Sequence, residues 1–451
     1  MTECTQSSFE FQAHFRRQVK AEFDGGMMTS DAGGLLLRET DRRLQLLDRF
    51  SECFLDGRDA RRVRHSLREL VAQRVYGLAL GYEDLNDHEQ LRQDPVLKVL
   101  AGKEEMAEPL AGKSTLNRLE LSAGTADRYK KITFWKDSID ELLVAVFLEA
   151  HTEAPDSIVL DIDTTDVALH GAQEGRFFHG YYDQYCYLPL YVFCGEHLLC
   201  VRLRRANIDA SAGSLVEIQR IVGQIRQRWP AVRITLRGDS GFCREELMSW
   251  CEGNGVDYVF GFARNPRLRA TIGEALAAAA QQWEQTRQPA RVFVEFAYET
   301  TTGSWSRARR VVAKAEHIDG KENPRYVVTS LAEQDWPAQK LYEQLYCARG
   351  DMENRIKEQF SLFADRVSAE TMRANQLRMY FSAIAYVLLC GLRRLGLQST
   401  EMALAQAATI RLRLLRIGAV VRISIRRICL SLPRSYPWPD LFGQVHRALT
   451  G

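Results

Sequence analysis

Residues 233–247, RITLRGDSGFCREEL, contain an apolar run that ends at an aspartate set between two glycines. Ile234 and Leu236 alternate with other residues as they do in a β-strand, and Asp239 follows directly after the run. One interpretation is a turn, because glycine gives backbone freedom and aspartate forms local hydrogen bonds in turns. The other is a functional carboxylate at the carboxyl end of a strand, where small neighbours let a large ligand approach the backbone. The rest of the chain bears on this choice.

Residues 157–169, SIVLDIDTTDVAL, form a second apolar run that ends in acids. Asp161 and Asp163 are two residues apart, so their side chains share one face of the predicted strand. A hairpin around Gly195 and an amphipathic helix separate this strand from the one that ends at Asp239. This order of elements predicts a mixed sheet in which the two strands are neighbours and their acids meet at one edge. The alternative for each segment is a strand end closed by a local turn.

A third acidic site lies on a predicted helix later in the chain. Tyr346, Arg349, Glu353 and Lys357 follow one another at offsets of three, four and four residues, which places them on one helix face. A solvated stripe of ion pairs is an alternative explanation for this face. The functional interpretation gains weight because three acidic sites would then converge on one region of the sheet.

Carboxylates gathered in one place repel one another and raise one another's pKa. Hard divalent cations hold such clusters together, and ligands that are all oxygen suit magnesium or manganese. Two such ions stabilise the attacking and leaving oxygens of an in-line displacement at phosphorus. The acids therefore indicate a metal-dependent enzyme acting on phosphodiesters, with Asp163, Asp239 and Glu353 as ligands and Asp161 as a competing first ligand.

The hydrophobic patterning divides the chain into regions of different texture. We expect a helical domain over residues 1–130, an α/β core over 131–266 and 334–400, a β-rich insertion over 267–333 and a basic region over 401–451. Helices are expected on both faces of the core sheet, and the Glu353 helix belongs to its second part. No two cysteines form a C-x-x-C motif, so the sequence offers neither a zinc ribbon nor a redox pair.

Charge is distributed unevenly, although the net charge is only +2. Residues 58–68 contain a cluster that we expect to contact DNA backbone, consisting of Arg58, Arg61, Arg62, Arg64 and Arg68. The tail from Met402 to Pro439 has seven arginines and no acid. Its apolar residues either pack on the rest of the chain or contribute to a dimer. No secretion signal is visible and the apolar stretches are short, so we expect a cytoplasmic protein without a membrane partner.

These features resemble, as a set, the DDE transposases of bacterial insertion sequences. The motifs that carry the resemblance are DTT at 163–165, RGDSGF at 237–242, YVVTSL at 326–331 and YCARGDMEN at 346–354. The last of these is similar to the Tyr-x-x-Arg-x-x-x-Glu signature of the group. Two further stretches, FDGGMMTSDAGGLLL at 23–37 and FFHGYYDQYCYLPLYVF at 177–193, resemble insertion sequence family thirteen-eighty.

The resemblance implies a ribonuclease-H-like catalytic core interrupted by a β insertion, with an N-terminal helical DNA-binding domain. It implies that Asp163, Asp239 and Glu353 bind two Mg²⁺ ions, for which Mn²⁺ substitutes, and that Tyr346 and Arg349 contact DNA phosphate. The signature's lysine, seven residues after the glutamate, is Phe360 here, and Lys357 takes its place. The implied activity is cut-and-paste transposition by a homodimer that binds the terminal inverted repeats of its element and target DNA. The host is then bacterial, with the protein on the nucleoid when bound.

Three other functions compete with this one. A glycoside hydrolase also uses paired carboxylates, but the basic helix face of Arg349 and Lys357 argues against it. A transposase-derived protein that only binds DNA is the second, and the intact acids argue against that. Another ribonuclease-H-like nuclease is the third. Metal-dependent cleavage of DNA separates the catalytic readings from the binding protein.

Overall fold

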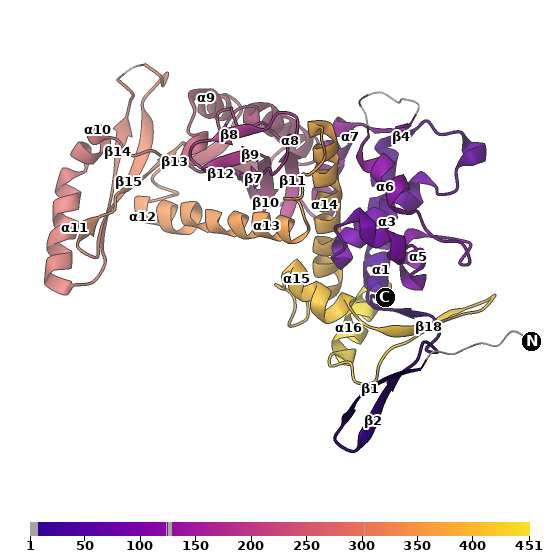
Figure 1. The fold of residues 1–451 in the computed structure, drawn as a ribbon. Helices are drawn as coiled ribbons and strands as arrows, with labels where there is room; N and C mark the ends of the chain where they lie inside the picture. The colour runs from indigo at the N-terminus through magenta and orange to yellow at the C-terminus, as the bar shows by residue number, and fades with distance from the viewer. Residues whose placement is uncertain (1–7, 123, 125–128, 302) are drawn as a thin grey trace, which may run out of the picture. The chain divides into compact units, whose positions relative to one another are not determined.

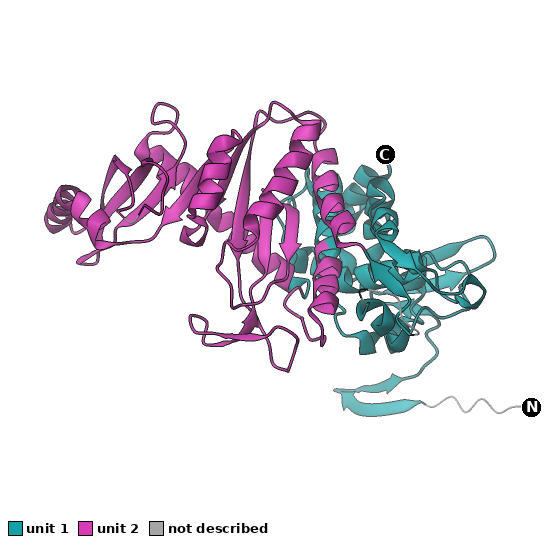
Figure 2. Cartoon of the chain, turned by 90° about the horizontal axis from the view of Figure 1, so that it is seen from above, with its two compact units in different colours: residues 1–134, 361–363, 384–451 teal, residues 135–360, 364–383 magenta. Residues whose placement is uncertain are grey.

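The computed structural model describes residues 8–122, 124, 129–301 and 303–451 (Figure 1). The chain forms two compact units, coloured separately in Figure 2. Unit 1 consists of residues 1–134, 361–363 and 384–451, and unit 2 of residues 135–360 and 364–383. The first unit therefore draws on both end regions of the chain, and the second on its middle.

Unit 2 is built on a nine-stranded mixed sheet with the order β11-β10-β6-β12-β13-β17-β15-β14, and β16 pairs with β15. Its strands are β6 (Ser157–Thr164), β10 (Leu190–Cys194), β11 (His197–Arg202), β12 (Arg233–Gly238), β13 (Asp257–Phe262), β14 (Ala290–Tyr298), β15 (Arg309–Ile318), β16 (Lys321–Glu322) and β17 (Arg325–Thr329). The β6–β12 and β12–β13 pairs are parallel, and the other pairs are antiparallel. The mixed sheet and the predicted pairing of β6 with β12 are confirmed.

Short strands and helices complete this unit. A small sheet comprises β7 (Val167–Ala168), β8 (Phe177–His179) and β9 (Gln184–Tyr187). The helices that precede β14 are α7 (Lys136–Glu149), α8 (Ser214–Arg228), η3 (Ser240–Phe242), α9 (Glu245–Gly253), α10 (Pro266–Thr271) and α11 (Gly273–Thr286). Those that follow are α12 (Ala338–Lys340), η4 (Leu341–Tyr346), η5 (Cys347–Arg349), α13 (Gly350–Ser361) and the first part of α14 (Met372–Leu392). The end of α14 and η6 (Arg393–Leu397) belong to unit 1.

Helices cover both faces of the large sheet. Successive side chains of one strand point to opposite faces, so neighbouring residues join different cores. On β13, Tyr258 and Phe260 join a core that includes residues of α7, α8 and α9. Val259, between them, joins a second cluster with Leu341 and Leu345 of η4. The second face is the one toward which Asp161 and Asp163 point, since Leu160 and Ile162 on the same strand belong to the first core.

The region expected to form a β-rich insertion, residues 267–333, contains most of α10, then α11, and the strands β14 to β17. Its last strand pairs antiparallel with β13, from Val259 opposite Thr329 to Phe262 opposite Tyr326. The strands of this region therefore extend the core sheet instead of forming a sheet of their own.

Unit 1 is helical over much of its N-terminal part, as predicted, but it also contains strands. Its N-terminal elements are β1 (Phe9–His14), β2 (Arg17–Ala21), β3 (Met28–Thr29), α1 (Gly34–Leu44), α2 (Leu46–Glu52), β4 (Phe54–Asp56), η1 (Ala60–Arg62), α3 (Leu67–Leu80), η2 (Leu85–Asp87), α4 (His88–Leu91), α5 (Pro95–Ala101), α6 (Lys113–Glu120) and β5 (Ile132–Phe134). Its C-terminal elements are α15 (Ala407–Ile410), η7 (Arg411–Leu415), β18 (Ala419–Ile423), β19 (Ile428–Ser431) and α16 (Pro439–Thr450).

The two end regions of the chain are joined by backbone contacts. β3 pairs with β18, and β18 pairs with β19. The amide of Gly33 donates to the carbonyl of Leu415 at 3.1 Å. A Cβ at Gly33 would lie 1.7 Å from the carbonyl oxygen of Leu414, so only glycine permits this approach. Residues 401–451, expected as a separate basic region, thus belong to one unit with the N-terminal helices.

The apolar residues of the tail pack inside unit 1. Ile410, Leu414, Leu415 and Ile417 are at most 2% exposed, whereas Leu412 is 69% exposed. Of the two interpretations of this set, packing on the rest of the chain is therefore correct for four of its five members. Leu412 alone is left on the surface and does not make a continuous dimer face.

Two arginines of the tail donate hydrogen bonds to carbonyls at the end of α3. Arg411 donates to the carbonyls of Ala79 at 3.0 Å and Leu78 at 3.4 Å, in the last turn of α3. Arg416 donates to the carbonyl of Leu80 at 3.4 Å. The last carbonyls of a helix have no partner within it, and cationic donors suit them. These side chains are therefore engaged within the unit.

Residues 372–397 are long and apolar enough to cross a membrane. Their most apolar stretch has a mean hydropathy of 1.3, but 89% of that stretch is buried in the protein. This segment is longer than the apolar stretch expected from the sequence because α14 continues into η6. Its burial is that of a core helix.

We predict that Arg411→Ala lowers the free energy of unfolding by about 1–3 kcal/mol, because it removes the side-chain donor to the carbonyl of Ala79 at the end of α3. Denaturant unfolding followed by circular dichroism measures the change. Leu412→Ala, one residue away and exposed, is the matched control and should change stability by less than about 0.5 kcal/mol. Equal stability of the two variants would contradict the assigned role of Arg411.

Candidate functional site

Asp161 is held by an arginine from the neighbouring strand. Asp161 on β6 stands opposite Arg237 on β12 in the parallel register. The guanidinium donates to both carboxylate oxygens, at 2.5 and 2.7 Å. Both residues are buried, at 4% and 7% exposure. Charges buried this deeply require a partner, and here each supplies the other's.

The same guanidinium reaches the helical segment above the sheet. Nη1 of Arg237 donates to the carbonyl of Leu345 at 2.5 Å. Leu345 belongs to η4, a π-helix that ends at Tyr346. Arg237 therefore ties two core strands to the residue that precedes Tyr346. Arg237 thus takes both oxygens of Asp161 in a buried ion pair.

Asp163 is bound from the other side of the chain. Its Oδ2 accepts a hydrogen bond from Arg349 at 3.0 Å, and its Oδ1 accepts one from the amide of Thr164 at 2.8 Å. Arg349 also donates to Oε1 of Glu353 at 3.3 Å, one helical turn further on. The guanidinium thus bridges two of the three predicted acids. A solvated helix stripe explains the contact with Glu353 but not the contact with Asp163 on β6.

The pKa of Asp163 is raised to about 6, chiefly by burial and in smaller part by the nearby carboxylates of Asp239 and Glu353, while Arg349 and the amide of Thr164 lower it. These interactions place all three predicted acids in one electrostatic neighbourhood. The prediction that carboxylates gathered here raise one another's pKa is confirmed for Asp163.

Asp239 forms the turn that one interpretation predicts, and it stands at the strand end that the other requires. Its Oδ1 accepts a hydrogen bond from the amide of Gly241 at 2.8 Å, so it begins a turn into η3. It also follows the last residue of β12 directly, and its charge is near enough to raise the pKa of Asp163. The turn fixes the carboxylate at the strand end, which is what a functional carboxylate at that position requires.

A glycine on β13 makes room for Tyr346. A Cβ at Gly261 would lie 2.6 Å from the Tyr346 hydroxyl oxygen and 3.0 Å from the amide nitrogen of Ser240. Burial raises the pKa of Tyr346, and Asp239 raises it further. Tyr346 is therefore packed beside the Asp239 turn. Sequence reasoning missed Gly261, although a glycine inside a strand commonly marks a close approach.

Lys357 lies one turn beyond Glu353 on α13 and is exposed. It forms no hydrogen bond or ion pair with any residue in the part of the chain that the structure describes. Phe360, which stands where the signature has a lysine, is partly buried. On this helix face, Lys357 is thus a cation with no acid partner among the described residues, whereas Arg349 contacts two acids.

A divalent metal fits the chemistry of this site, since its donors are carboxylate oxygens on strand ends and a helix. The pKa of Asp163 is raised first by burial and then by the charges of Asp239 and Glu353, and a cation bound between the three acids would offset both effects. In the described ranges, no three His, Cys, Asp or Glu side chains are arranged to hold a metal ion as they stand. The cation between Asp163 and Glu353 is instead the guanidinium of Arg349.

The arginine cluster of residues 58–68 lies in unit 1 and divides into two kinds. Arg58 pairs with Asp56 at 2.6 Å, and Arg68 pairs with Asp41 and Asp48 at 2.9 and 2.6 Å. The side chains of Arg61 and Arg62 are 89% and 88% exposed, and Arg64 is exposed as well. Arg61 and Arg62 share Asp59, at 3.2 and 3.8 Å, but their exposed guanidinium groups can still reach an external anion, as can that of Arg64. Arg58 and Arg68 are committed to internal acids.

Comparison with known proteins places the chain in a family. No curated protein matches it. Among solved structures it is similar to a piggyBac transposase in a synaptic complex with hairpin DNA, determined by cryo-EM. That similarity has a TM-score of 0.41 and 10% sequence identity, and it covers 86% of this chain and 79% of the other. The family model for the transposase DDE domain, group 1, matches residues 11–451. The chain therefore belongs to this family of DDE transposases.

Proposed function

We propose that the protein excises and reinserts an insertion sequence by metal-dependent cleavage and joining of DNA strands. The observation that carries the proposal is the guanidinium of Arg349, which joins Asp163 on β6 to Glu353 on α13, with Asp239 close enough to raise the pKa of Asp163. The fold alone does not require three acids in one place, whereas a metal-dependent reaction at phosphate does. The Tyr-Arg-Glu signature and membership of insertion sequence family thirteen-eighty are part of this proposal.

We further propose a ribonuclease-H-like core. The strands β11, β10 and β6 run antiparallel to one another, and β12 and β13 continue in parallel from β6. This mixed order supports the proposal, as does the position of Asp163 and Asp239 at the ends of two adjacent parallel strands.

The reaction would consist of two displacements at phosphorus. Water first cleaves a phosphodiester at the end of the element and releases a 3′-hydroxyl. That hydroxyl then attacks a phosphodiester of the target, forms the new bond and expels the target's 3′-oxygen. Two Mg²⁺ ions, or Mn²⁺, held by Asp163, Asp239 and Glu353 would supply positive charge to the reacting phosphate when bound.

The chain's own cations would position the DNA strand. Arg349 has five N–H donors, of which the two carboxylates take only some, so others are left for a phosphate oxygen. Lys357, free of acid partners among the described residues, would contact a neighbouring phosphate. Tyr346 beside the Asp239 turn would orient the strand near the cut. Arg61, Arg62 and Arg64 of unit 1 would bind DNA backbone elsewhere.

We predict that Asp239→Asn and Glu353→Gln each lower the rate of strand cleavage in Mg²⁺ by about 10²–10³-fold or more, because each removes a charged ligand from the transition state. Binding of DNA should change less than about threefold, since affinity comes mainly from phosphate contacts made elsewhere. Cleavage gels and fluorescence anisotropy measure the two quantities. Asp351→Asn, an exposed acid on the same helix as Glu353, is the control and should cut normally.

We predict that Asp163→Asn abolishes cleavage yet stabilises the metal-free protein at pH 7 by about 1–3 kcal/mol. The pKa of Asp163 is raised in the folded protein, so the ionised carboxylate destabilises the fold above pH 6 and costs nothing once it is protonated below pH 4. The gain in unfolding temperature should therefore be full above pH 6 and vanish as the pH falls toward 4. A variant less stable than the parent at pH 7 would refute the linkage.

We predict that Asp161→Asn separates positioning from metal binding. Loss of the carboxylate charge weakens the hold on Arg237 and so on the segment leading to Tyr346. The rate of cleavage at saturating DNA should fall by about tenfold, while Mn²⁺ affinity measured by calorimetry stays within about twofold of the parent value. Asp163→Asn should lose Mn²⁺ binding. Loss of Mn²⁺ binding in Asp161→Asn as well would make Asp161 a ligand.

We also propose that the protein acts as a homodimer on DNA, because one element has two ends that must be joined to one target. The mass of the complex with DNA of the element's ends, measured by light scattering, should equal two chains and two duplexes. A complex with a single chain at saturating protein would exclude pairing of the ends. Truncation at residue 400 is unsuitable for locating the contact, since the tail forms part of the core of unit 1.

A further inference from the structure

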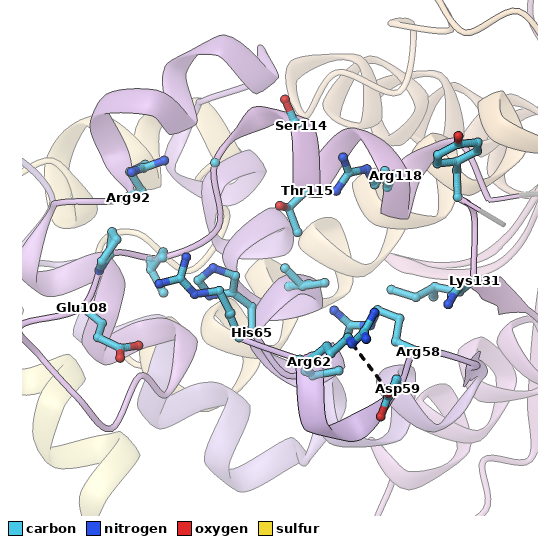
Figure 3. Close-up of a pocket in the computed structure, with 18 of the residues that line it drawn as sticks. Arg58, Asp59, Arg62, His65, Arg92, Glu108, Ser114, Thr115, Arg118 and Lys131 are labelled. Atoms are coloured by element: carbon cyan, nitrogen blue, oxygen red, sulfur yellow. Dashed lines mark ion pairs between the residues drawn. The ribbon is translucent and has the colours of Figure 1, made fainter.

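Unit 1 contains a cavity of about 840 Å³ that the catalytic proposal does not use. It lies between the segment around η1, the first turns of α6 and the strand β5 (Figure 3). In Figure 3, Thr115 and Arg118 of α6 lie across an opening from Arg62 and Arg58, with Lys131 at one side. The volume is far larger than a phosphate group and compares with pockets that hold a small organic ligand.

Cations dominate the lining of this cavity. Its basic side chains are Arg58, Arg62, Arg64, Arg92, Arg118 and Lys131, and its acids are Asp59, Glu89 and Glu108. The acids already have partners: Asp59 contacts Arg61, Glu89 contacts Arg92, and Glu108 contacts Lys103.

Three of the cations form no close ion pair, although Lys131 interacts electrostatically with Asp59. Arg64, Arg118 and Lys131 form no side-chain hydrogen bond or ion pair with any residue that the structure describes. Like charges facing one space repel, so an anion placed among them is stabilised. The cavity is therefore suited to a ligand that carries phosphate.

The rest of the lining suits a flat apolar body with a polar edge. The wall consists of Val63, Leu70, Pro109, Leu110 and Ile132, with Tyr129 beside them. Ser114 and Thr115 supply hydroxyl groups. Nδ1 of His65 is buried and has no hydrogen-bond partner among the described residues, and burial lowers the pKa of His65. Because this nitrogen is buried, the contact of His65 with the cavity is made by the rest of its ring.

We propose that this cavity binds one unpaired nucleotide of a DNA strand, with its base against the apolar wall and its phosphate among Arg64, Arg118 and Lys131. A base that stays paired and stacked in a duplex cannot enter a pocket, so proteins that read a base in this way take it from single-stranded or opened DNA. The inference deepens the proposed function and rests on it. It gives unit 1 a role in holding a strand end or opened base pair, beyond contact with duplex backbone.

The test compares two DNA probes of arbitrary sequence on the full-length protein by fluorescence anisotropy. One is a blunt duplex, and the other is the same duplex with a single-stranded extension. We expect the extension to strengthen binding by about tenfold, from the stacking and phosphate contacts of the unpaired nucleotide. Ser114→Trp, which fills the cavity without removing a charge, should abolish that preference and leave affinity for the blunt duplex unchanged.

A matched pair of arginine variants separates the cavity from the general basic surface. Arg118→Ala should reduce the preference for the extension at least about threefold. Arg61→Ala, from an exposed arginine that does not line the cavity, should weaken both probes equally and keep their ratio. Melting curves confirm that each variant is folded.

The outcomes distinguish this inference from the function on which it rests. Equal affinity of the parent protein for both probes, or an undiminished preference in Ser114→Trp, overturns the nucleotide site but leaves the transposase proposal standing. Failure to bind either probe removes the proposed DNA-binding function itself. Competition by a free deoxynucleoside monophosphate as strong as that of the extended strand would make the ligand a free nucleotide and overturn the strand assignment.

Discussion

Two carboxylates on one face of β6 need positive partners inside the protein. The arrangement of unit 2 around β6 follows from which side chains supply these partners. Asp161 takes Arg237 from the next strand, and Asp163 takes Arg349 from the helical segment across that face. Burying either charge without a partner would cost several kcal/mol. The pairing of β6 with β12 and the position of the segment from η4 to α13 are therefore coupled to the same pair of acids.

The two pairs differ in a way that bears on function. The Asp161–Arg237 pair is closed, with both carboxylate oxygens used and a further contact to the Leu345 carbonyl. The Arg349 contacts are open, because Glu353 is 51% exposed and the contact at 3.3 Å is long. A closed pair fixes geometry, whereas an open one can exchange its partners for a metal or a phosphate. On the proposed function, the Asp161–Arg237 pair would hold the site in position, and the Arg349 contacts would change when metal or phosphate binds.

The sequence predicted the parts of this site that depend on local periodicity. Alternation along 157–163 placed Asp161 and Asp163 on one face, and the order of elements made β6 and β12 neighbours. It did not identify Arg237 or Gly261, because their roles depend on contacts with Asp161 and Tyr346, far away in the chain. The β3–β18 pairing was beyond reach for the same reason, since a two-residue strand has no periodicity to recognise.

Charge runs were the least reliable guide, because composition does not show which charges are spent within the protein. Arg58 and Arg68 pair with internal acids, and Arg411 and Arg416 hold the carbonyls at the end of α3. What remains for an external anion is the subset that the fold leaves without partners among the described residues, and in unit 1 part of that subset faces a single cavity. Arg64, Arg118 and Lys131 are exposed, so solvent screens much of their mutual repulsion, and an anion placed among them would remove the rest. On the proposed function that anion is DNA, which would give these cations of unit 1 a common role.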